Sequence, residues 1–186
     1  MTIIGITGSI ASGKTTVAHL MAGKKYPLFS ADIVVSNLYK EKKFNEILVQ
    51  KFKLNSKRKI KDQIKLILKK NKKNLYKLES IIHPFVRKEM INFFKKKNKM
   101  LFLEIPLLIE SKLNRYFDKL VFVGANKGLR IKRYLKKKGD KKTFKLLDKR
   151  QFSAALKKNI CDYTINNSYS LVVLRKNVKI FMRNYE

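Results

Sequence analysis

A glycine loop between an apolar run and a helical pattern constrains this chain more than any other feature. The stretch Gly8-Ser9-Ile10-Ala11-Ser12-Gly13-Lys14-Thr15 matches G-x-x-x-x-G-K-[ST] at every fixed position. Residues 3–6 before it predict a short buried strand, and residues 16–21 after it predict a helix. Backbone N–H groups of such a loop, with the helix N-terminus, form a nest for anionic phosphates. The first hypothesis is therefore a nucleotide-binding α/β domain.

Four more short apolar runs predict strands at residues 27–29, 100–105, 120–123 and 163–165. Helical patterns separate them, which favours a parallel sheet covered on both faces. Residues 44–99 are mainly helical, and we expect Pro84 to open a helix at its first position. The predicted fold is α/β: a P-loop-type parallel five-stranded sheet flanked by helices, with an inserted helical lobe.

The formal net charge of +32 suggests nucleic-acid binding, but the kind of cation argues against it. Of the 45 basic residues, 37 are Lys and 8 are Arg, whereas base readers and phosphate clamps favour the planar fork of Arg. AT-rich coding also enriches Lys together with Asn, Ile, Phe and Tyr. We therefore interpret the Lys runs as solvated surface and expect no dedicated nucleic-acid partner. These runs are residues 69–70, 72–73, 95–97 and 136–138.

Composition excludes several other classes of protein. No apolar run approaches the ~20 residues of a membrane helix, so we expect no membrane association. The single cysteine, Cys161, cannot form a disulfide within the chain. With only two histidines in addition to it, the chain has too few ligands for a typical zinc site. The N-terminus has no basic stretch before the first strand, unlike a signal peptide. We therefore expect a cytoplasmic protein.

The motif itself assigns chemistry to two side chains. Lys14 can reach the β- and γ-phosphates of ATP, and the Thr15 hydroxyl can bind Mg²⁺, which neutralises phosphate charge. Two acids follow predicted strands, at the edge of the sheet where α/β proteins bind ligands. Asp32 can serve as a general base or hold the metal through water, or it can simply cap a helix starting near Val34. Glu104 can contact Mg²⁺ through water, or can simply face solvent.

Two further segments carry charge beside predicted helices. His83 and Arg87 flank the start of the helix that we expect at Pro84, where they would favour an anion or merely cap the helix. Arg130 and Arg133 lie in one predicted helix, where an Arg can stabilise the transferring phosphoryl group. From spacing alone, an ordinary cap and a solvated helix face are the preferred interpretations.

Taken in order, these pieces resemble the dephospho-CoA kinase family over nearly the whole chain. His-Pro and Pro-Leu-Leu-x-Glu, in this order and spacing, are much more specific than the phosphate loop. The matching segments are residues 5–17, Ala31-Asp32, Ile82-His83-Pro84 with Arg87 and Glu89, residues 105–110, Phe117-Asp118-Lys119, Arg133, Gln151 and residues 162–167.

The resemblance implies transfer of the ATP γ-phosphate to the ribose 3′-hydroxyl of dephospho-CoA, with Mg²⁺, by a monomer. It implies one domain, with a core at about 1–34, 100–137 and 159–186, a helical CoA-binding lobe at about 35–99 and a lid at about 138–158. The implied catalytic residues are Asp32 as general base, Lys14 and Arg133, and the implied metal ligand is Thr15. Nucleotide binding falls to Gly8, Ala11, Ser12, Gly13, Lys14, Thr15 and Thr16, and acceptor binding to His83, Arg87, Pro106 and Leu107.

The chain departs from the family pattern at four positions. Ser30 stands where the family usually has Asp, and Lys137 replaces a second lid Arg, which loses the bidentate fork. Ser9 and Ala11 replace two loop glycines, and we expect them to fit only if their backbones avoid angles that favour glycine.

Three alternatives remain open. A related P-loop kinase acting on a nucleoside or nucleotide would share the loop and the lid. A basic nucleic-acid-binding ATPase would bind polynucleotides with a steep salt dependence. A paralogue that binds nucleotide without catalysis is compatible with the changes at Ser30 and Lys137.

Overall fold

The computed structural model describes residues 1–71 and 73–185. The chain divides into two compact units. The sheet unit comprises Met1–Ser30 and Lys96–Glu186, and the helical unit comprises Ala31–Lys95. All five strands belong to the first unit.

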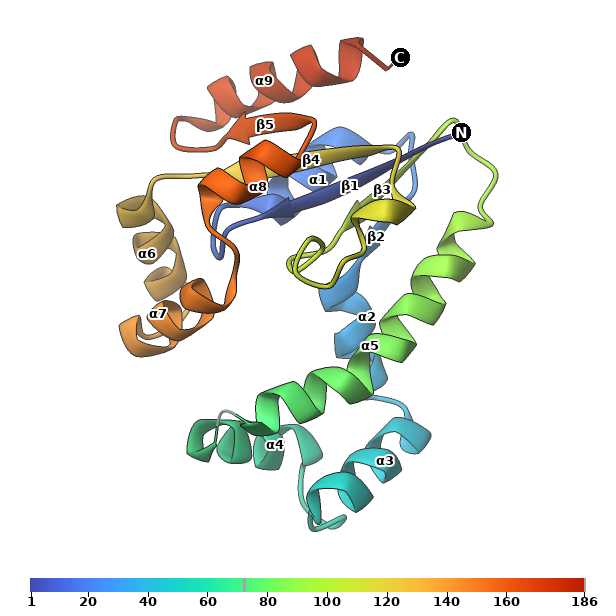
Figure 1. Cartoon of the computed structure of the whole chain (residues 1–186), viewed down its shortest axis with the longest axis vertical. Coiled ribbons are helices and arrows are strands. Elements are labelled where there is room, and N and C mark those ends of the chain that lie inside the picture. Colours follow the sequence, from blue (N-terminus) through green and yellow to red (C-terminus); the bar gives the residue numbers. More distant parts are fainter. Residues whose placement is uncertain (72, 186) are drawn as a thin grey trace. The chain divides into compact units, whose positions relative to one another are not determined.

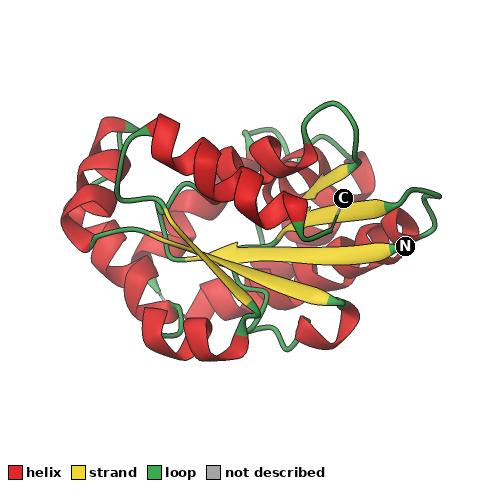
Figure 2. Ribbon diagram, turned by 90° about the horizontal axis from the view of Figure 1, so that it is seen from above, coloured by secondary structure: helices red, strands yellow, loops and turns green. Residues whose placement is uncertain are grey.

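The strands form one parallel sheet in the order β2-β3-β1-β4-β5, which Figure 2 shows as a twisted layer. This confirms the predicted five-stranded parallel sheet. Because β1 is central, the loop that follows it opens at the carboxyl edge of the sheet, between the ends of β3 and β4. The strands are β1 (Thr2–Gly8), β2 (Leu28–Ser30), β3 (Met100–Glu104), β4 (Lys119–Gly124) and β5 (Tyr163–Asn166).

Alternate residues of β1 face the two sides of the sheet. Ile4 and Ile6 are wholly buried in the core that includes residues of α1 (Lys14–Ala22) and α9 (Leu171–Arg183). Gly5 faces the other side, where an added Cβ would lie 2.8 Å from Leu108 and 2.9 Å from Phe117. Because side chains alternate along β1, α1 and α9 pack on one face of the sheet and the segment after β3 packs on the other.

The remaining helices of the sheet unit follow β4 and β3. In Figure 1, α6 and α7 (brown and orange) lie beside one another, and α8 leads into β5. Phe144 of α7 is buried against Tyr134 of α6, with ring centroids 5.6 Å apart. These helices are α6 (Lys127–Lys136), α7 (Lys141–Arg150) and α8 (Ala154–Ile160), with a 3₁₀ turn at Asn114–Tyr116.

The helical unit has its own aromatic core. Phe44 is wholly buried, and its ring meets Tyr39 and Phe85 edge-on at centroid distances of 5.5 Å and 5.4 Å. Edge-to-face pairs of this kind add to the stabilisation from area burial. The helices are α2 (Ala31–Leu38), α3 (Lys42–Phe52), α4 (Ile60–Lys70) and α5 (Lys73–Phe94).

One prediction about this unit is wrong. Pro84 lies inside α5 rather than at the first position of a new helix. A mid-helix proline removes one hydrogen bond to the carbonyl four residues earlier, and Figure 1 shows that α5 bends along its length. The buried stripe Leu78, Ile82, Val86 and Met90 continues through the proline, so packing maintains the helix across it.

The Lys runs bear out the surface interpretation where they are described. Lys73, residues 95–97 and residues 136–138 are exposed, and Lys72 lies outside the described residues. Among the helices of residues 1–71 and 73–185, none has the length and apolar character needed to cross a membrane.

Candidate functional site

The phosphate loop joins β1 to α1 as the motif predicts. Gly13 is the N-cap of α1 with φ 90°, so the helix begins at Lys14 and its first amides point out of the loop. A Cβ on Gly8 would overlap the Val123 carbonyl oxygen, and one on Gly13 would overlap the Asn167 amide. Both glycines are therefore required by close approach, and Gly13 also by its backbone angle.

Ala11 departs from the expectation for this loop. Its φ is 56°, in the left-handed region that favours glycine, whereas Ser9 avoids that region. The expectation that Ala11 fits only where its backbone avoids glycine-favoured angles is therefore wrong. An L-residue pays about 1–2 kcal/mol in this conformation, and the surrounding contacts hold it there.

Side chains from outside the loop engage its carbonyl oxygens. Asn167 Nδ2 donates to Ser12 O at 2.8 Å, and Arg133 Nη1 donates to the same oxygen at 3.4 Å. Arg130 Nη1 donates to Ile10 O at 3.4 Å. A carbonyl turned toward such donors is turned away from an anion, so these contacts leave the loop favourable to phosphate.

The two arginines of α6 differ from the expectation of a solvated helix face. Arg130 is buried and forms an ion pair of 2.6 Å with Asp148 of α7. Its guanidinium also lies over the Phe144 ring. Arg133 is half-buried and reaches Asn167 Oδ1 at 3.5 Å. The preferred solvated interpretation was wrong because α7 and the phosphate loop cover this side of α6.

Glu104 joins the loop to two strands. Its buried carboxylate ends β3 and accepts hydrogen bonds from Thr15 Oγ1 at 2.7 Å and from Ser30 Oγ at 3.3 Å. The interpretation that Glu104 simply faces solvent is wrong. A hydroxyl and a carboxylate at this edge are oxygen ligands of the kind that Mg²⁺ prefers, so the residues present suit that ion.

Lys14 is buried at the start of α1 and its ammonium donates to Ser9 O at 3.1 Å within the loop. This contact holds the cation over the loop, where a phosphate oxygen would compete with the carbonyl. Thr16 follows on the exposed side of α1.

The sheet unit also holds part of the expected acceptor site. The Pro106 carbonyl accepts from Thr7 Oγ1 at 3.1 Å and from Lys157 Nζ at 3.4 Å. Leu107 follows in the same turn and is half-buried. Thr7 directly precedes the phosphate loop, so Pro106 is tied to β1, the strand that leads into the loop.

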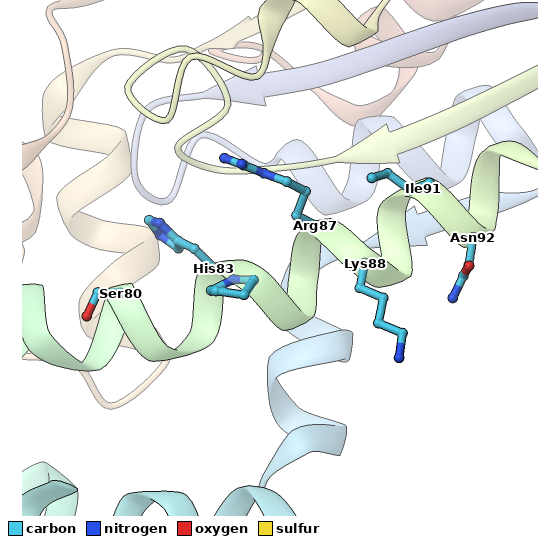
Figure 3. A pocket seen from close by; sticks show the side chains of 7 residues that line it. Ser80, His83, Arg87, Lys88, Ile91 and Asn92 are labelled. Carbon is cyan, nitrogen blue, oxygen red and sulfur yellow. The ribbon is translucent and has the colours of Figure 1, made fainter.

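The other expected site residues belong to the helical unit. Asp32 is exposed in the first turn of α2, which begins at Ala31, so the interpretation of Asp32 as the cap of a helix starting near Val34 is wrong. His83 and Arg87 project to the same side of α5 (Figure 3). His83 lies within α5, so it is not a cap either. Around these two residues is a groove of about 590 Å³, lined by Ser80, His83, Pro84, Arg87, Lys88, Ile91 and Asn92.

Several contributing residues were not assigned a role from the sequence. Gln151 and Asn167 fall in segments that match the family, but nothing local shows that they reach the loop. Gln151 Oε1 accepts from Ile10 N at 2.6 Å, across 141 positions of sequence. Only the order of matching segments signals such residues, because their partners lie far away in the chain.

A phosphate loop after the central strand of a parallel sheet, with a buried lysine and a hydroxyl beside a strand-end carboxylate, defines a P-loop kinase. The family model for dephospho-CoA kinase matches residues 2–172. A dephospho-CoA kinase of Fusobacterium nucleatum is 32% identical over 189 residues, covering 96% of each chain. The chain therefore belongs to the dephospho-CoA kinase family, whose members are ATP-dependent kinases.

Solved structures agree on the fold. The crystal structure of TT1252 from Thermus thermophilus is 26% identical with a TM-score of 0.83, covering 100% of this chain and 98% of that one. A dephospho-CoA kinase from Campylobacter jejuni is 22% identical with a TM-score of 0.68, covering 100% and 97%.

Proposed function

We propose that this chain transfers the γ-phosphate of ATP to the ribose 3′-hydroxyl of dephospho-CoA. One observation carries the proposal: Lys14 and Thr15 begin α1, with the Glu104 carboxylate 2.7 Å from the Thr15 hydroxyl. Family membership supports the choice of acceptor, since relatives that match over nearly their whole length are named dephospho-CoA kinase.

The phosphate loop does most of the donor-side work. Gly8 and residues 11–16 bind the phosphates through backbone amides, and Lys14 neutralises charge on the β- and γ-oxygens. Arg133, whose guanidinium lies beside Ser12 O, stabilises the transferring group. Thr15 would hold Mg²⁺ directly and Glu104 through water. The ion would neutralise negative charge on the phosphates.

We assign acceptor-side roles to residues of each unit separately. Asp32 orients the 3′-hydroxyl and takes its proton as the oxygen attacks the γ-phosphorus and ADP leaves. His83 and Arg87 bind the acceptor from the α5 groove, and Pro106 with Leu107 bind it from the turn after β3. In this proposal residues 35–99 are the CoA-binding lobe and residues 138–158 are the lid that excludes water.

The same proposal extends to a monomer working in the cytoplasm. A single cysteine suits a reducing compartment.

The test is a coupled ADP-release assay with ATP, Mg²⁺ and dephospho-CoA. AMP and adenosine serve as comparison acceptors, and single-stranded DNA as a comparison activator. We expect ADP release that depends on dephospho-CoA, with CoA identified by mass. Turnover with a nucleoside instead, or stimulation by DNA, would contradict the proposal and favour one of the alternative kinases or ATPases.

A further inference from the structure

We propose that Gln151 is a positioning residue that sets the phosphate loop against the acceptor-side turn, through a strap segment formed by residues 151–157. The significance for catalysis rests on the proposed function. That Gln151 holds the phosphate loop in place does not depend on the proposed function. Gln151 lies between α7, which ends at Arg150, and α8, which begins at Ala154.

The side-chain amide of Gln151 binds the loop at two points. Its Oε1 accepts from Ile10 N at 2.6 Å, and its Nε2 donates to Gly8 O at 3.5 Å. A single amide thereby binds one donor and one acceptor of the loop backbone, as a neighbouring strand would. Ile10 N–H consequently points away from the anion nest, and the orientation of residues 8–10 depends on Gln151.

The rest of the strap segment is attached to the turn after β3. Phe152 N donates to Glu110 Oε1 at 2.9 Å, and Lys157 Nζ donates to the same oxygen at 2.7 Å. Lys157 is wholly buried, and its ammonium also contacts Pro106 O. Two charges withdrawn from water are stable only with good geometry, so this pair fixes the strap segment to residues 106–110.

A further hydrogen bond attaches the acceptor-side turn to β1. Thr7 Oγ1 donates to Pro106 O at 3.1 Å, and Thr7 is covalently joined to Gly8. The loop therefore connects to the acceptor-side turn both through β1 and through Gln151. Although the strap segment falls within the proposed lid, its contacts tie it to the fixed core.

The functional consequence follows from the geometry of phosphoryl transfer. Donor and acceptor oxygens must align in line, and a displacement of about 1 Å can cost about 100-fold in rate. Gln151 binds the backbone of residues 8–10 and acts through it. Its loss should therefore weaken ATP binding and turnover without changing how the acceptor binds.

The experiment compares Gln151→Met, which keeps the size of the side chain but removes the amide, with Gln151→Glu, which keeps the acceptor for Ile10 N–H. Asn159→Ala on the exposed side of α8 is the matched control. Calorimetry with a non-hydrolysable ATP analogue, amide hydrogen exchange at Ile10 and steady-state kinetics are measured on all four proteins, with thermal melting as a check of folding.

For Gln151→Met we expect analogue binding about tenfold weaker, because the variant loses both hydrogen bonds to the loop. Ile10 should exchange at least about tenfold faster, and the KM for dephospho-CoA should stay within about twofold. Gln151→Glu should restore much of the Ile10 protection, and it answers the same question if the Met variant does not fold.

Unchanged analogue affinity in a folded variant, even with a lower melting temperature, would reduce Gln151 to a structural role and overturn the proposal. If instead the wild type does not phosphorylate dephospho-CoA while Gln151→Met still weakens analogue binding, the proposed acceptor fails and the role of Gln151 stands.

Discussion

Thr15 Oγ1 donates a 2.7 Å hydrogen bond to Glu104 Oε1, across 89 positions of sequence. The other carboxylate oxygen accepts from Ser30 Oγ, at the end of β2. The family usually has Asp where this chain has Ser30, so the buried Glu104 has a neutral neighbour here. The Glu104 carboxylate therefore accepts a hydrogen bond from the Thr15 hydroxyl, which we propose as a ligand of Mg²⁺.

Replacing Glu104 with Gln should therefore raise the Mg²⁺ requirement. The change keeps the shape but removes the charge, and loss of an outer-sphere partner typically costs about 10–100-fold in metal affinity or activity. The measurement is initial rate against Mg²⁺ concentration at saturating ATP. Ser30→Ala is the control, since it removes the weaker hydrogen bond and leaves the carboxylate. A Mg²⁺ curve identical to that of the wild type would remove Glu104 from the metal site.

Ala11→Gly should stabilise the protein despite the greater freedom of glycine in the unfolded chain. With φ at 56°, Ala11 is strained by about 1–2 kcal/mol, and the added unfolded-state entropy takes back about 0.4–1 kcal/mol. We expect a net gain of about 0.5–1 kcal/mol in the free energy of unfolding. Urea denaturation measures it, with Ala18→Gly in the helix interior as a control that should destabilise. Destabilisation by Ala11→Gly would show that the methyl group makes contacts worth more than the strain.

How far the sequence predicts this molecule depends on the range of the interactions. The five strands and the loop were predictable because each is a local pattern of apolar or glycine residues. Pro84 was placed wrongly because buried residues on both sides carry α5 through it. The burial of Arg130 depends on its ion pair with Asp148 of α7, which no pattern within α6 reveals. The roles of Gln151 and Lys157 are pairings between distant segments, and residue spacing does not encode them.

Asp32→Asn should lower turnover strongly while ATP affinity stays near that of the wild type. The amide keeps the size of the side chain but cannot take the 3′-hydroxyl proton, and loss of a general base typically costs about 10²–10⁴-fold. Single-turnover kinetics and calorimetric ATP binding test this together. Asp62→Asn, an exposed acid in the first turn of α4, is the control. Normal turnover, or lost ATP binding, would count against the role of Asp32.

Asp148→Asn should destabilise the contact between α6 and α7. The change leaves the buried Arg130 guanidinium without its charged partner, and we expect a loss of about 1–3 kcal/mol because Asp148 itself is partly exposed. Urea denaturation of both single variants and the double variant with Arg130→Met isolates the pair energy. Additive effects would mean that the 2.6 Å pair contributes nothing beyond its separate residues.

Cys161 should react slowly and over an unusual pH range. Burial raises the pKa of its thiol to about 11; Asp162 and Glu110 also raise it, and Lys157 opposes them. The alkylation rate of the folded protein should therefore still be rising above pH 9, whereas the chain in guanidinium should show the ordinary cysteine midpoint near ~8.5.

The raised pKa of Cys161 also determines how the stability of the fold changes with pH. Between the ordinary cysteine value and about 11, the folded state binds the proton more tightly than the unfolded state, so stability falls as pH rises through this window. Lysines also titrate there, so the relevant quantity is the difference between the wild type and Cys161→Ala. We expect the fall to be shallower in the variant. Parallel stability curves, or a folded-state alkylation midpoint near that of the unfolded chain, would show that the thiol is not held in its protonated form.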